Sequence, residues 1–217
     1  MDLYEALYTT RAMRRVKPDP IPEDVVRLML DAAIRAPSGS NVQNWRWLTV
    51  SDRATMAELG TLYAEAWEVL QNTVYADRGP LTDQEQRVQS SAEWLAANFA
   101  SIPLAVLAFH RNDPSGASVY PAVWSLMLAA RGQGVGATLT TIVGAFKSAE
   151  LFELLGIPTN KGWTNAAVIT CGYPKGRWGL AVRRPARDVV FSERWGEHPS
   201  WTDEDPMWPG ARSSSSP

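Results

Sequence analysis

Residues 36–50 read APSGSNVQNWRWLTV and contain the end of one element, a polar turn and the start of another. The residue before Pro37 is disfavoured in the α region, so the preceding helical pattern is expected to end here. Bulky and partly β-branched residues then predict a strand over 45–50. The polar residues between them suit a turn that bonds its own backbone. The amides of Asn41 and Gln43, which both donate and accept, equally suit the edge of a heteroaromatic ring, and both interpretations stay open.

Helical and strand patterns alternate on both sides of this stretch. Pro22 with Glu23 and Asp24 is typical of a helix start, because proline tolerates the first turn and acidic side chains suit the helix dipole. This alternation is typical of the α/β or α+β class. Further helices are predicted over residues 1–11, 54–99 with a break near 77–80, about 121–131 and 149–155, and further strands over 102–110 and 166–171.

The composition excludes several classes of protein. With 217 residues, 45% of them hydrophobic and 20% charged, the chain is expected to form one domain or one domain with arms. Its 21 Lys and Arg residues against 23 Asp and Glu residues leave no basic footprint for nucleic acid and no polybasic patch for a membrane. The longest apolar run, 102–109, is far shorter than the roughly 20 residues of a membrane span. Asp2, Glu5 and Arg11 interrupt the region where a signal peptide needs an apolar stretch, so a cytoplasmic location is expected.

The common templates for metal binding and nucleophilic catalysis do not match this sequence. One cysteine and two histidines cannot build a Cys/His zinc site. His110 and His198 lie in no HExxH or nucleophile-elbow pattern, and Cys171 lies in an apolar strand pattern that predicts a buried, inert thiol. We therefore expect neither a metal site nor a catalytic protein side chain.

A glycine-rich stretch is followed by hydroxyl-bearing residues. Gly132, Gly134 and Gly136 close a helix, whereas the glycines of a dinucleotide-binding loop follow a strand and open a helix, so they predict a helix cap and a tight turn. The next residues, 137–144, read ATLTTIVG. Their hydroxyls and backbone amides can serve a flat polar ligand.

Arginines gather near both ends of the chain. Arg11, Arg14 and Arg15 lie in one short segment, and Arg183 and Arg184 precede a proline near the far end. Two clusters of fixed cations in a chain of net charge −2 indicate a local anion site. Guanidinium groups bind phosphate in a bidentate manner, so a phosphate is the expected anion.

Four of these stretches together resemble the nitroreductase-like FMN-dependent oxidoreductases. They are TRAMRRVKPDPIP (10–22), APSGSNVQNWRWLTV (36–50), GQGVGATLTT (132–141) and TCGYPKGRWGLAVRRPARDVV (170–190), in the order found in that family. The resemblance implies an α+β three-layer sandwich, with a central, mostly antiparallel sheet flanked by helices. It also implies a homodimer with exchanged terminal arms. Residues 1–195 are expected to form the FMN-binding domain, and 196–217 a C-terminal extension, either an arm or a partly disordered tail.

The resemblance also implies roles for individual residues. Arg11 and Arg14 match the phosphate and ribityl contacts, Arg183 matches the C-terminal phosphate arginine, and Arg184 is a second candidate there. The turn that borders the flavin, contributed by the partner subunit, matches Pro37, Ser38, Gly39 and Asn41. The loop under the isoalloxazine ring, near N5 and O4, matches Thr140, Thr141 and Ile142.

Five positions depart from the family pattern. Thr10 replaces the first arginine of a pair, and Ala12 replaces a serine but keeps its backbone amide for the cofactor. Asn44 replaces a proline. Trp124 and Ser125 stand where Gln-Asn is common, so Trp124 is expected to form a wall of the substrate pocket.

The function implied by the resemblance places the chemistry on the cofactor. FMN accepts a hydride at N5 from NAD(P)H and then reduces a nitroaromatic or quinone-like acceptor by two electrons in a ping-pong cycle, while the protein binds and orients. Another activity of the same fold is the alternative: a dehydrogenase, reductive dehalogenation or flavin fragmentation. A non-enzymatic flavin-binding protein is the third reading. No nucleic acid or membrane partner is expected, and the substrate is a small aromatic molecule.

Tryptophan is over-represented, with ten residues in the chain. Its large planar surface suits cores, interfaces and stacking on flat ligands. Trp45 is expected in the core. Five of the ten lie in the closing segment, which wraps the partner in the resembling family, so most of the excess is expected at a dimer interface: Trp163, Trp178, Trp195, Trp201 and Trp208.

Overall fold

The structure is a computed structural model, and it describes residues 1–201, 207 and 208. The chain forms two compact units. The sheet unit comprises Ala12–Gly176, and the terminal unit comprises Met1–Arg11 together with the chain from Arg177 onward. Most of the C-terminal extension expected over 196–217 lies outside the described residues.

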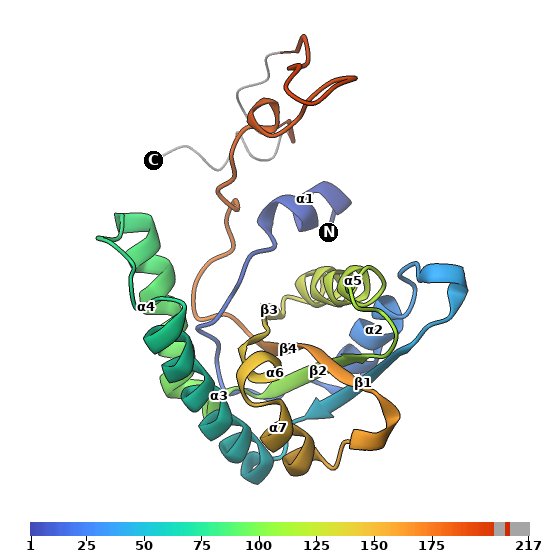
Figure 1. The fold of residues 1–217 in the computed structure, drawn as a ribbon, viewed down its shortest axis with the longest axis vertical. Helices are drawn as coiled ribbons and strands as arrows, with labels where there is room; N and C mark the ends of the chain where they lie inside the picture. The colour runs from blue at the N-terminus through green and yellow to red at the C-terminus, as the bar shows by residue number, and fades with distance from the viewer. Residues whose placement is uncertain (202–206, 209–217) are drawn as a thin grey trace. The chain divides into compact units, whose positions relative to one another are not determined.

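The sheet unit is built on one antiparallel sheet (Figure 1). The strands lie in the order β1-β2-β4-β3, so β1 and β3 are the two edges. Every pair of neighbours in this order is antiparallel. The strands are β1 (Trp45–Val50), β2 (Leu104–His110), β3 (Gly136–Thr140) and β4 (Thr164–Gly172).

Helices cover both faces of this sheet. The two faces of β2 show why, since Leu104, Val106 and Ala108 lie in one hydrophobic core and Ala105, Leu107 and Phe109 lie in the other. Alternate residues of a strand point to opposite faces, so a strand that is apolar throughout must be buried on both. The first core also contains residues of α2 and α5, and the second contains residues of α3, α4, α6 and α7, which gives three layers (Figure 1).

Apart from the short helix α6, which was not predicted, the helices of the described chain agree with the periodicity of the sequence. The long helical stretch after β1 divides into two helices that form an antiparallel hairpin (Figure 1). The predicted helices and the three predicted strands are confirmed, with small differences at their ends. The helices are α1 (Leu3–Thr9), α2 (Glu23–Ala33), α3 (Arg53–Thr73), α4 (Asp83–Asn98), α5 (Val119–Gly132), α6 (Ile142–Phe146) and α7 (Ser148–Leu155).

The strand β3 was not predicted from the sequence. The helix α5 does end at Gly132, and Gly134 adopts a φ of +72° in the turn, as the glycines indicated. Gly136, however, already begins the edge strand, which pairs with β4 from Gly136↔Gly172 to Thr140↔Val168. The residues GATLT have little of the bulk that marks a strand, so their extended conformation depends on pairing with β4.

The N-terminal segment Met13–Lys17 runs along the β3 edge of the sheet. The Met13 N–H donates to the Ala137 carbonyl at 3.1 Å, and the Lys17 N–H donates to the Tyr173 carbonyl at 2.7 Å. Two paired glycines permit this close approach. A Cβ atom on Gly136 would lie 2.8 Å from the Met13 Cβ, and one on Gly172 would lie 2.6 Å from a Val16 methyl group.

We predict that Gly172→Ala destabilises the fold. The added methyl group meets Val16 and Pro103 in a closely packed region, and overpacking of this kind typically costs about 1–3 kcal/mol. Urea denaturation followed by circular dichroism measures the change in the free energy of unfolding. Gly176→Ala is the matched control, because nothing lies within 4 Å of a Cβ at that exposed position. Equal stability of the two variants would contradict the proposed close approach.

Candidate functional site

Arg14 is a half-buried cation in the sheet unit. Burial lowers the pKa of its guanidinium, and the phenol groups of Tyr63 and Tyr75 are its electrostatic neighbours. Within the described part of the chain, no carboxylate forms an ion pair with it. Removing a charge from water is costly unless a counter-charge compensates it. Arg14 is therefore suited to an anion supplied from outside the chain.

The segment Met13–Lys17, called the edge segment from here on, determines where Arg14 lies. Val16 forms an isolated antiparallel bridge with Pro174, so the backbone here is strand-like. Successive side chains of such a segment point to opposite sides. Arg14 accordingly lies near Tyr63 on α3, whereas the Arg15 guanidinium donates to the Ser90 hydroxyl on α4 at 3.4 Å.

Tyr63 connects Arg14 to the turn that follows β3. Its side chain is only 3% exposed and stacks on Phe99, with 4.7 Å between ring centroids. Burial raises the pKa of the Tyr63 phenol, and a hydrogen bond with Thr140 together with the nearby Arg14 acts in the opposite direction. The structure thus brings together Arg14 and Thr140, which are more than 120 residues apart. Neither Tyr63 nor Tyr75 was found from the sequence, because they lie in a helical pattern without a motif.

The Thr140–Ile142 turn is placed by the packing of the helix after it. Thr141 is exposed, and Ile142 begins the short helix α6. Gly144 in this helix lies so close to Asn165 that an added Cβ would be 2.7 Å from the Asn165 carbonyl oxygen. The Asn165 amide in turn donates to the carbonyls of Ala108 and Ala167, at 3.3 and 3.2 Å. The turn is thereby held against the centre of the sheet.

The turn after α2 bonds mainly to itself and to the start of α5. The Gln43 N–H donates to the Ser38 hydroxyl at 3.2 Å, and the Gln43 amide donates to the Asn41 side-chain oxygen at 3.0 Å. The Gly39 N–H donates to the Ser118 hydroxyl at 3.3 Å. Positive φ angles at Ser40, Asn41 and Gln43 show an unusual backbone. A cavity of about 650 Å³ lies between this turn and residues 112–119.

This turn and the Arg14 group lie at opposite edges of the sheet. The turn leads into β1, whereas Arg14 and Thr140 lie at β3, the other edge strand. With neighbouring strands about 4.8 Å apart, a four-stranded sheet separates its edges by roughly 14 Å. One chain therefore does not bring its own Pro37, Ser38, Gly39 and Asn41 to Arg14.

The remaining predicted arginines belong to the terminal unit. The Arg11 guanidinium donates to the Arg177 carbonyl at 3.2 Å, and the Ala181 N–H donates to the Tyr8 carbonyl at 3.0 Å. These contacts place Arg11 beside the segment that leads to Arg183 and Arg184, both of which are exposed. The boundary between the two units falls between Arg11 and Ala12. Ala12 is exposed and belongs to the sheet unit. The Thr10 hydroxyl donates to the Ala6 carbonyl at 2.6 Å, so it is directed back into α1.

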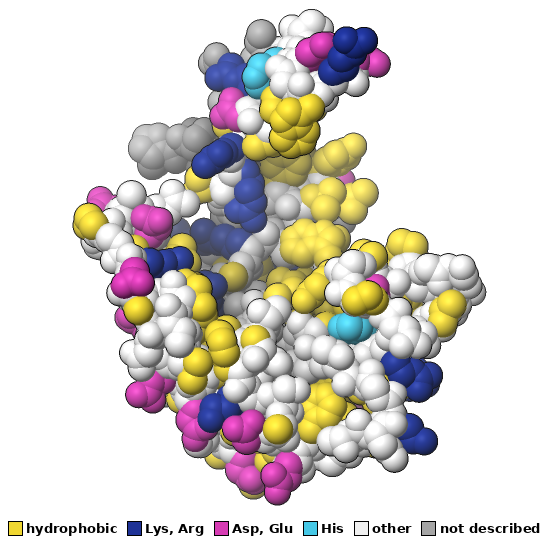
Figure 2. All heavy atoms as spheres, viewed as in Figure 1, with side chains coloured by type: hydrophobic (Ala, Val, Ile, Leu, Met, Phe, Trp, Pro, Cys, Tyr) yellow, Lys and Arg dark blue, Asp and Glu magenta, His cyan; other side chains and the backbone are white. Residues whose placement is uncertain are grey.

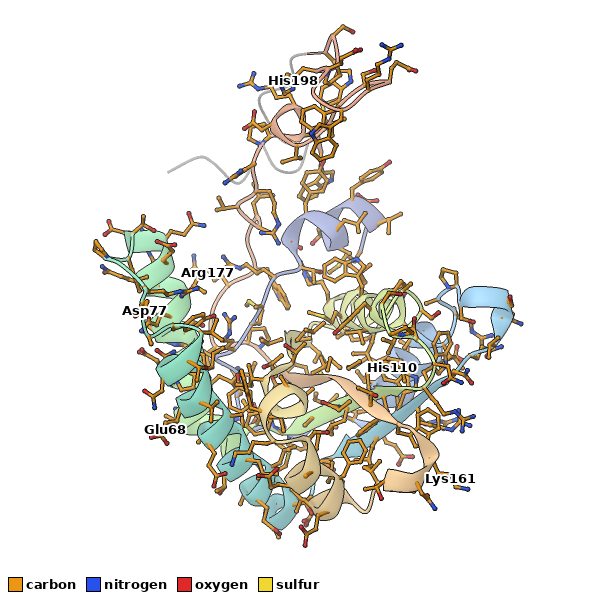
Figure 3. The ribbon with its side chains drawn as sticks, in the orientation of Figure 1. Glu68, Asp77, His110, Lys161, Arg177 and His198 are labelled. Atoms are coloured by element: carbon orange, nitrogen blue, oxygen red, sulfur yellow. The ribbon has the colours of Figure 1, made fainter. Side chains whose placement is uncertain are left out.

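The other residues considered from the sequence have varied surroundings. Trp124 on α5 is 39% exposed, whereas Trp45 is 5% exposed and belongs to the core as predicted. His110 lies at the end of β2 (Figure 3). Among the described residues, no group of three or more His, Cys, Asp or Glu side chains is placed to hold a metal ion. No helix in the same residues has both the length and the apolar character to cross a bilayer.

Taken together, the sheet unit is an α+β sandwich with an uncompensated cation and a hydroxyl-bearing turn at one sheet edge. The sequence model of the nitroreductase family matches residues 7–173. The chain belongs to the nitroreductase family. The family predicted from the four sequence motifs is therefore confirmed.

Several relatives and solved structures share most of the chain. An NADH dehydrogenase of Thermus thermophilus is 27% identical over 209 residues, which cover 88% of this chain and 96% of the relative. Protein DrgA of Synechocystis is 28% identical over 165 residues, 71% of this chain and 78% of that protein. An iodotyrosine deiodinase bound to FMN and 3-iodo-L-tyrosine superposes with a TM-score of 0.70 at 23% identity, covering 89% of this chain and 99% of that one. A nitroreductase with bound FMN from Desulfitobacterium hafniense superposes with a TM-score of 0.66 at 18% identity, covering 88% of this chain and 97% of that one.

Cys171 is predicted to be unreactive in the folded protein. It is fully buried on β4, and burial raises the pKa of its thiol to about 12. The thiolate is the reactive form, so labelling by a thiol reagent at pH 8 should be at least about 100-fold slower in the folded protein than in guanidinium chloride. Because the folded pKa exceeds the unfolded value of about 8.5, this group's contribution to stability is complete below that pH and is lost as the pH rises toward the folded value. Cys171→Ser measures the background, and rapid labelling of folded wild-type protein would disprove the prediction.

Proposed function

We propose that this protein is an FMN-dependent oxidoreductase that uses NAD(P)H to reduce nitroaromatic or quinone-like acceptors. The observation that supports this most directly is Arg14, a half-buried cation without a carboxylate partner, beside Thr140 in a chain of the nitroreductase family. The names of its relatives, an NADH dehydrogenase among them, and the FMN in two structures of the same fold agree with the proposal. A cytoplasmic location is proposed as well.

The residues present fit this cofactor. An anionic phosphate ester would supply the negative counter-charge that Arg14 lacks within the chain. The hydroxyls of Thr140 and Thr141 can donate to a polar ring edge. When bound, FMN supplies the redox chemistry, a hydride taken up from NAD(P)H and two electrons passed to the acceptor in a ping-pong cycle. The proposed phosphate and ribityl ligands are Arg11, the Ala12 backbone amide, Arg14, Arg183 and Arg184, and the proposed ring contacts are Thr140, Thr141 and Ile142.

A second copy of the chain is proposed to complete the site. Pro37, Ser38, Gly39 and Asn41 lie at the β1 edge, too far from the β3 edge to border the same ligand in one chain. The resemblance assigns this turn to the partner subunit of a homodimer with exchanged arms. Trp124 is then the proposed wall of the acceptor pocket. Residues 1–195 are proposed as the flavin domain, with 196–217 as an arm.

Two other functions are supported by specific features. The solved deiodinase of the same fold, together with Trp124 and Ser125 in place of Gln-Asn, favours a different activity on the same cofactor, such as reductive dehalogenation, dehydrogenation or flavin fragmentation. Thr10 and Ala12, in place of an arginine and a serine, favour a non-enzymatic flavin-binding protein.

Anaerobic reduction of the purified protein separates these functions. We expect a yellow protein that is bleached by NADH or NADPH and regains its colour when a nitroaromatic or a quinone is added. Colour that neither nicotinamide bleaches would reject the proposed reductase. Bleaching without reoxidation by any such acceptor would favour another activity of the fold. A colourless protein that does not take up added FMN would reject all three.

We predict that Arg14→Gln and Arg183→Ala each weaken FMN binding. Charge-assisted contacts typically contribute about 1.5–3 kcal/mol, so the dissociation constant should rise about 10- to 150-fold. Quenching of flavin fluorescence during titration of the apoprotein measures this constant. Arg27→Gln removes an exposed arginine on α2 and should leave it unchanged. An unchanged constant in Arg14→Gln or in Arg183→Ala would refute the role of that arginine.

A further inference from the structure

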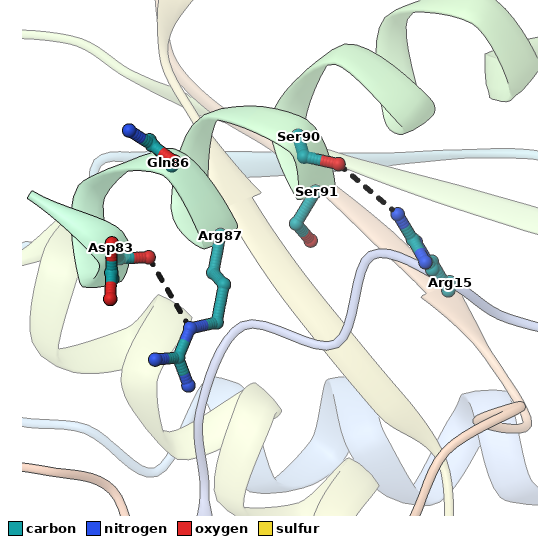
Figure 4. Close-up of a pocket in the computed structure, with 6 residues that line it drawn as sticks. All are labelled: Arg15, Asp83, Gln86, Arg87, Ser90 and Ser91. Atoms are coloured by element: carbon teal, nitrogen blue, oxygen red, sulfur yellow. Dashed lines mark hydrogen bonds between the residues drawn. The ribbon is translucent and has the colours of Figure 1, made fainter. Parts of the chain in front are cut away.

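A polar groove lies between the edge segment and α4, on the side of the segment opposite to Arg14. Its volume is about 690 Å³. Arg15 lines it from the edge segment, and the other lining residues come from α4 (Figure 4). They are Asp83, Gln86, Arg87, Ser90 and Ser91.

Both guanidinium groups in this groove keep their charge uncompensated. The Arg87 Nε donates to the backbone carbonyl of Asp83 at 3.3 Å, and Arg15 donates to the Ser90 hydroxyl at 3.4 Å (Figure 4). Within the described residues, neither arginine forms an ion pair with the Asp83 carboxylate or with any other. Each guanidinium carries five N–H donors, so most of these donors remain available to a ligand.

The spacing along α4 gathers these donors on one helical face. Residues three and four positions apart are neighbours on a helix, so Arg87 lies beside Ser90 and Ser91. Trp94 follows Ser90 by four positions, and the Lys175 ammonium lies 5.2 Å from its ring centroid. The Lys175 backbone N–H also donates to the Arg15 carbonyl at 2.9 Å, which ties the backbone of Arg15 to the segment after β4.

The carboxylates of α4 do not neutralise this face. Glu85 accepts hydrogen bonds from Thr82 in the capping box at the start of the helix. Glu93 accepts a hydrogen bond from Gln89 at 2.9 Å. On the face that Figure 2 shows, acidic side chains lie over the lower ends of α3 and α7 and also over the upper end of α4. Asp83 is thus the one carboxylate among the residues that line the groove.

We propose that this groove binds a phosphomonoester dianion, namely the 2′-phosphate of NADPH. Two guanidinium groups with adjacent hydroxyls form the donor set that phosphate recognition uses. The inference rests on the proposed function, in which a nicotinamide dinucleotide is the electron donor. Since NADH lacks this phosphate, the groove makes the enzyme selective for NADPH, and it is a second anion site, separate from that of Arg14.

Steady-state kinetics with both nicotinamides test this selectivity. The wild-type holoenzyme should have a kcat/KM at least about tenfold higher for NADPH than for NADH. Arg87→Gln should lower the value for NADPH about tenfold through KM, with kcat and the NADH value unchanged, because a contact made equally in ground and transition states affects KM alone. Ser90→Asp should produce a larger loss by repelling the phosphate. Arg27→Gln is the control and should change neither value.

Equal use of the two nicotinamides by the wild type, or equal losses for both in Arg87→Gln, would overturn the proposal.

Binding of nucleotide fragments gives a readout that does not depend on activity. Calorimetry with the holoenzyme should show that 2′,5′-ADP binds at least about tenfold more tightly than 5′-AMP, and Arg87→Gln should abolish this difference. Equal binding of the two fragments overturns the proposal. The proposal is also overturned if inorganic phosphate binds in an Arg87-dependent manner while the two fragments bind equally. The groove is then a site for free phosphate. If neither nicotinamide reduces the flavin, the proposed function fails, and the fragment experiment still decides what the groove binds.

Discussion

The rest of this molecule depends on the absence of side chains at two paired glycines. Gly136 and Gly172 face each other across β3 and β4, and a Cβ atom on either would lie within 2.8 Å of a side chain of the Met13–Lys17 segment. Because no Cβ intervenes, this segment bonds to Ala137 and Tyr173 and continues the sheet edge. The segment contains Arg14 and Arg15, so a packing constraint in the sheet determines where these two positive charges lie.

That placement has an electrostatic consequence. A strand-like segment directs neighbouring side chains to opposite sides, so two consecutive arginines serve two different environments. Arg14 is half-buried beside the phenol groups of Tyr63 and Tyr75, where an unpaired charge is costly and an external anion is favoured. Arg15 faces the polar surface of α4, where water and hydroxyl groups stabilise it. The net charge of −2 conceals both of these local excesses of positive charge.

Much of the fold could be predicted from local patterns. The helix α2 and the strands β1 and β2 show periodicity or continuous apolar runs, and their residues fill the two cores in the expected way. The strand β3 could not be predicted in this manner, since GATLT has weak strand propensity and is extended only because β4 pairs with it. The candidate site likewise contains residues that the sequence could predict and one that it could not. Arg14 and Thr140 belong to recognisable motifs, whereas Tyr63 lies between them through packing alone.

The sequence by itself determined the family, the order of the elements and the residue types available for binding an anion, because motifs and periodicity are local properties. Tertiary structure alone decided which of those residues meet. It brought Arg14 to Thr140 through Tyr63, and it separated both from the Pro37–Asn41 turn by the width of a four-stranded sheet. It also formed the groove between Arg15 and Arg87, which are 72 positions apart. Strand order and helix packing determine such distances, and both arise from contacts between residues far apart in the chain.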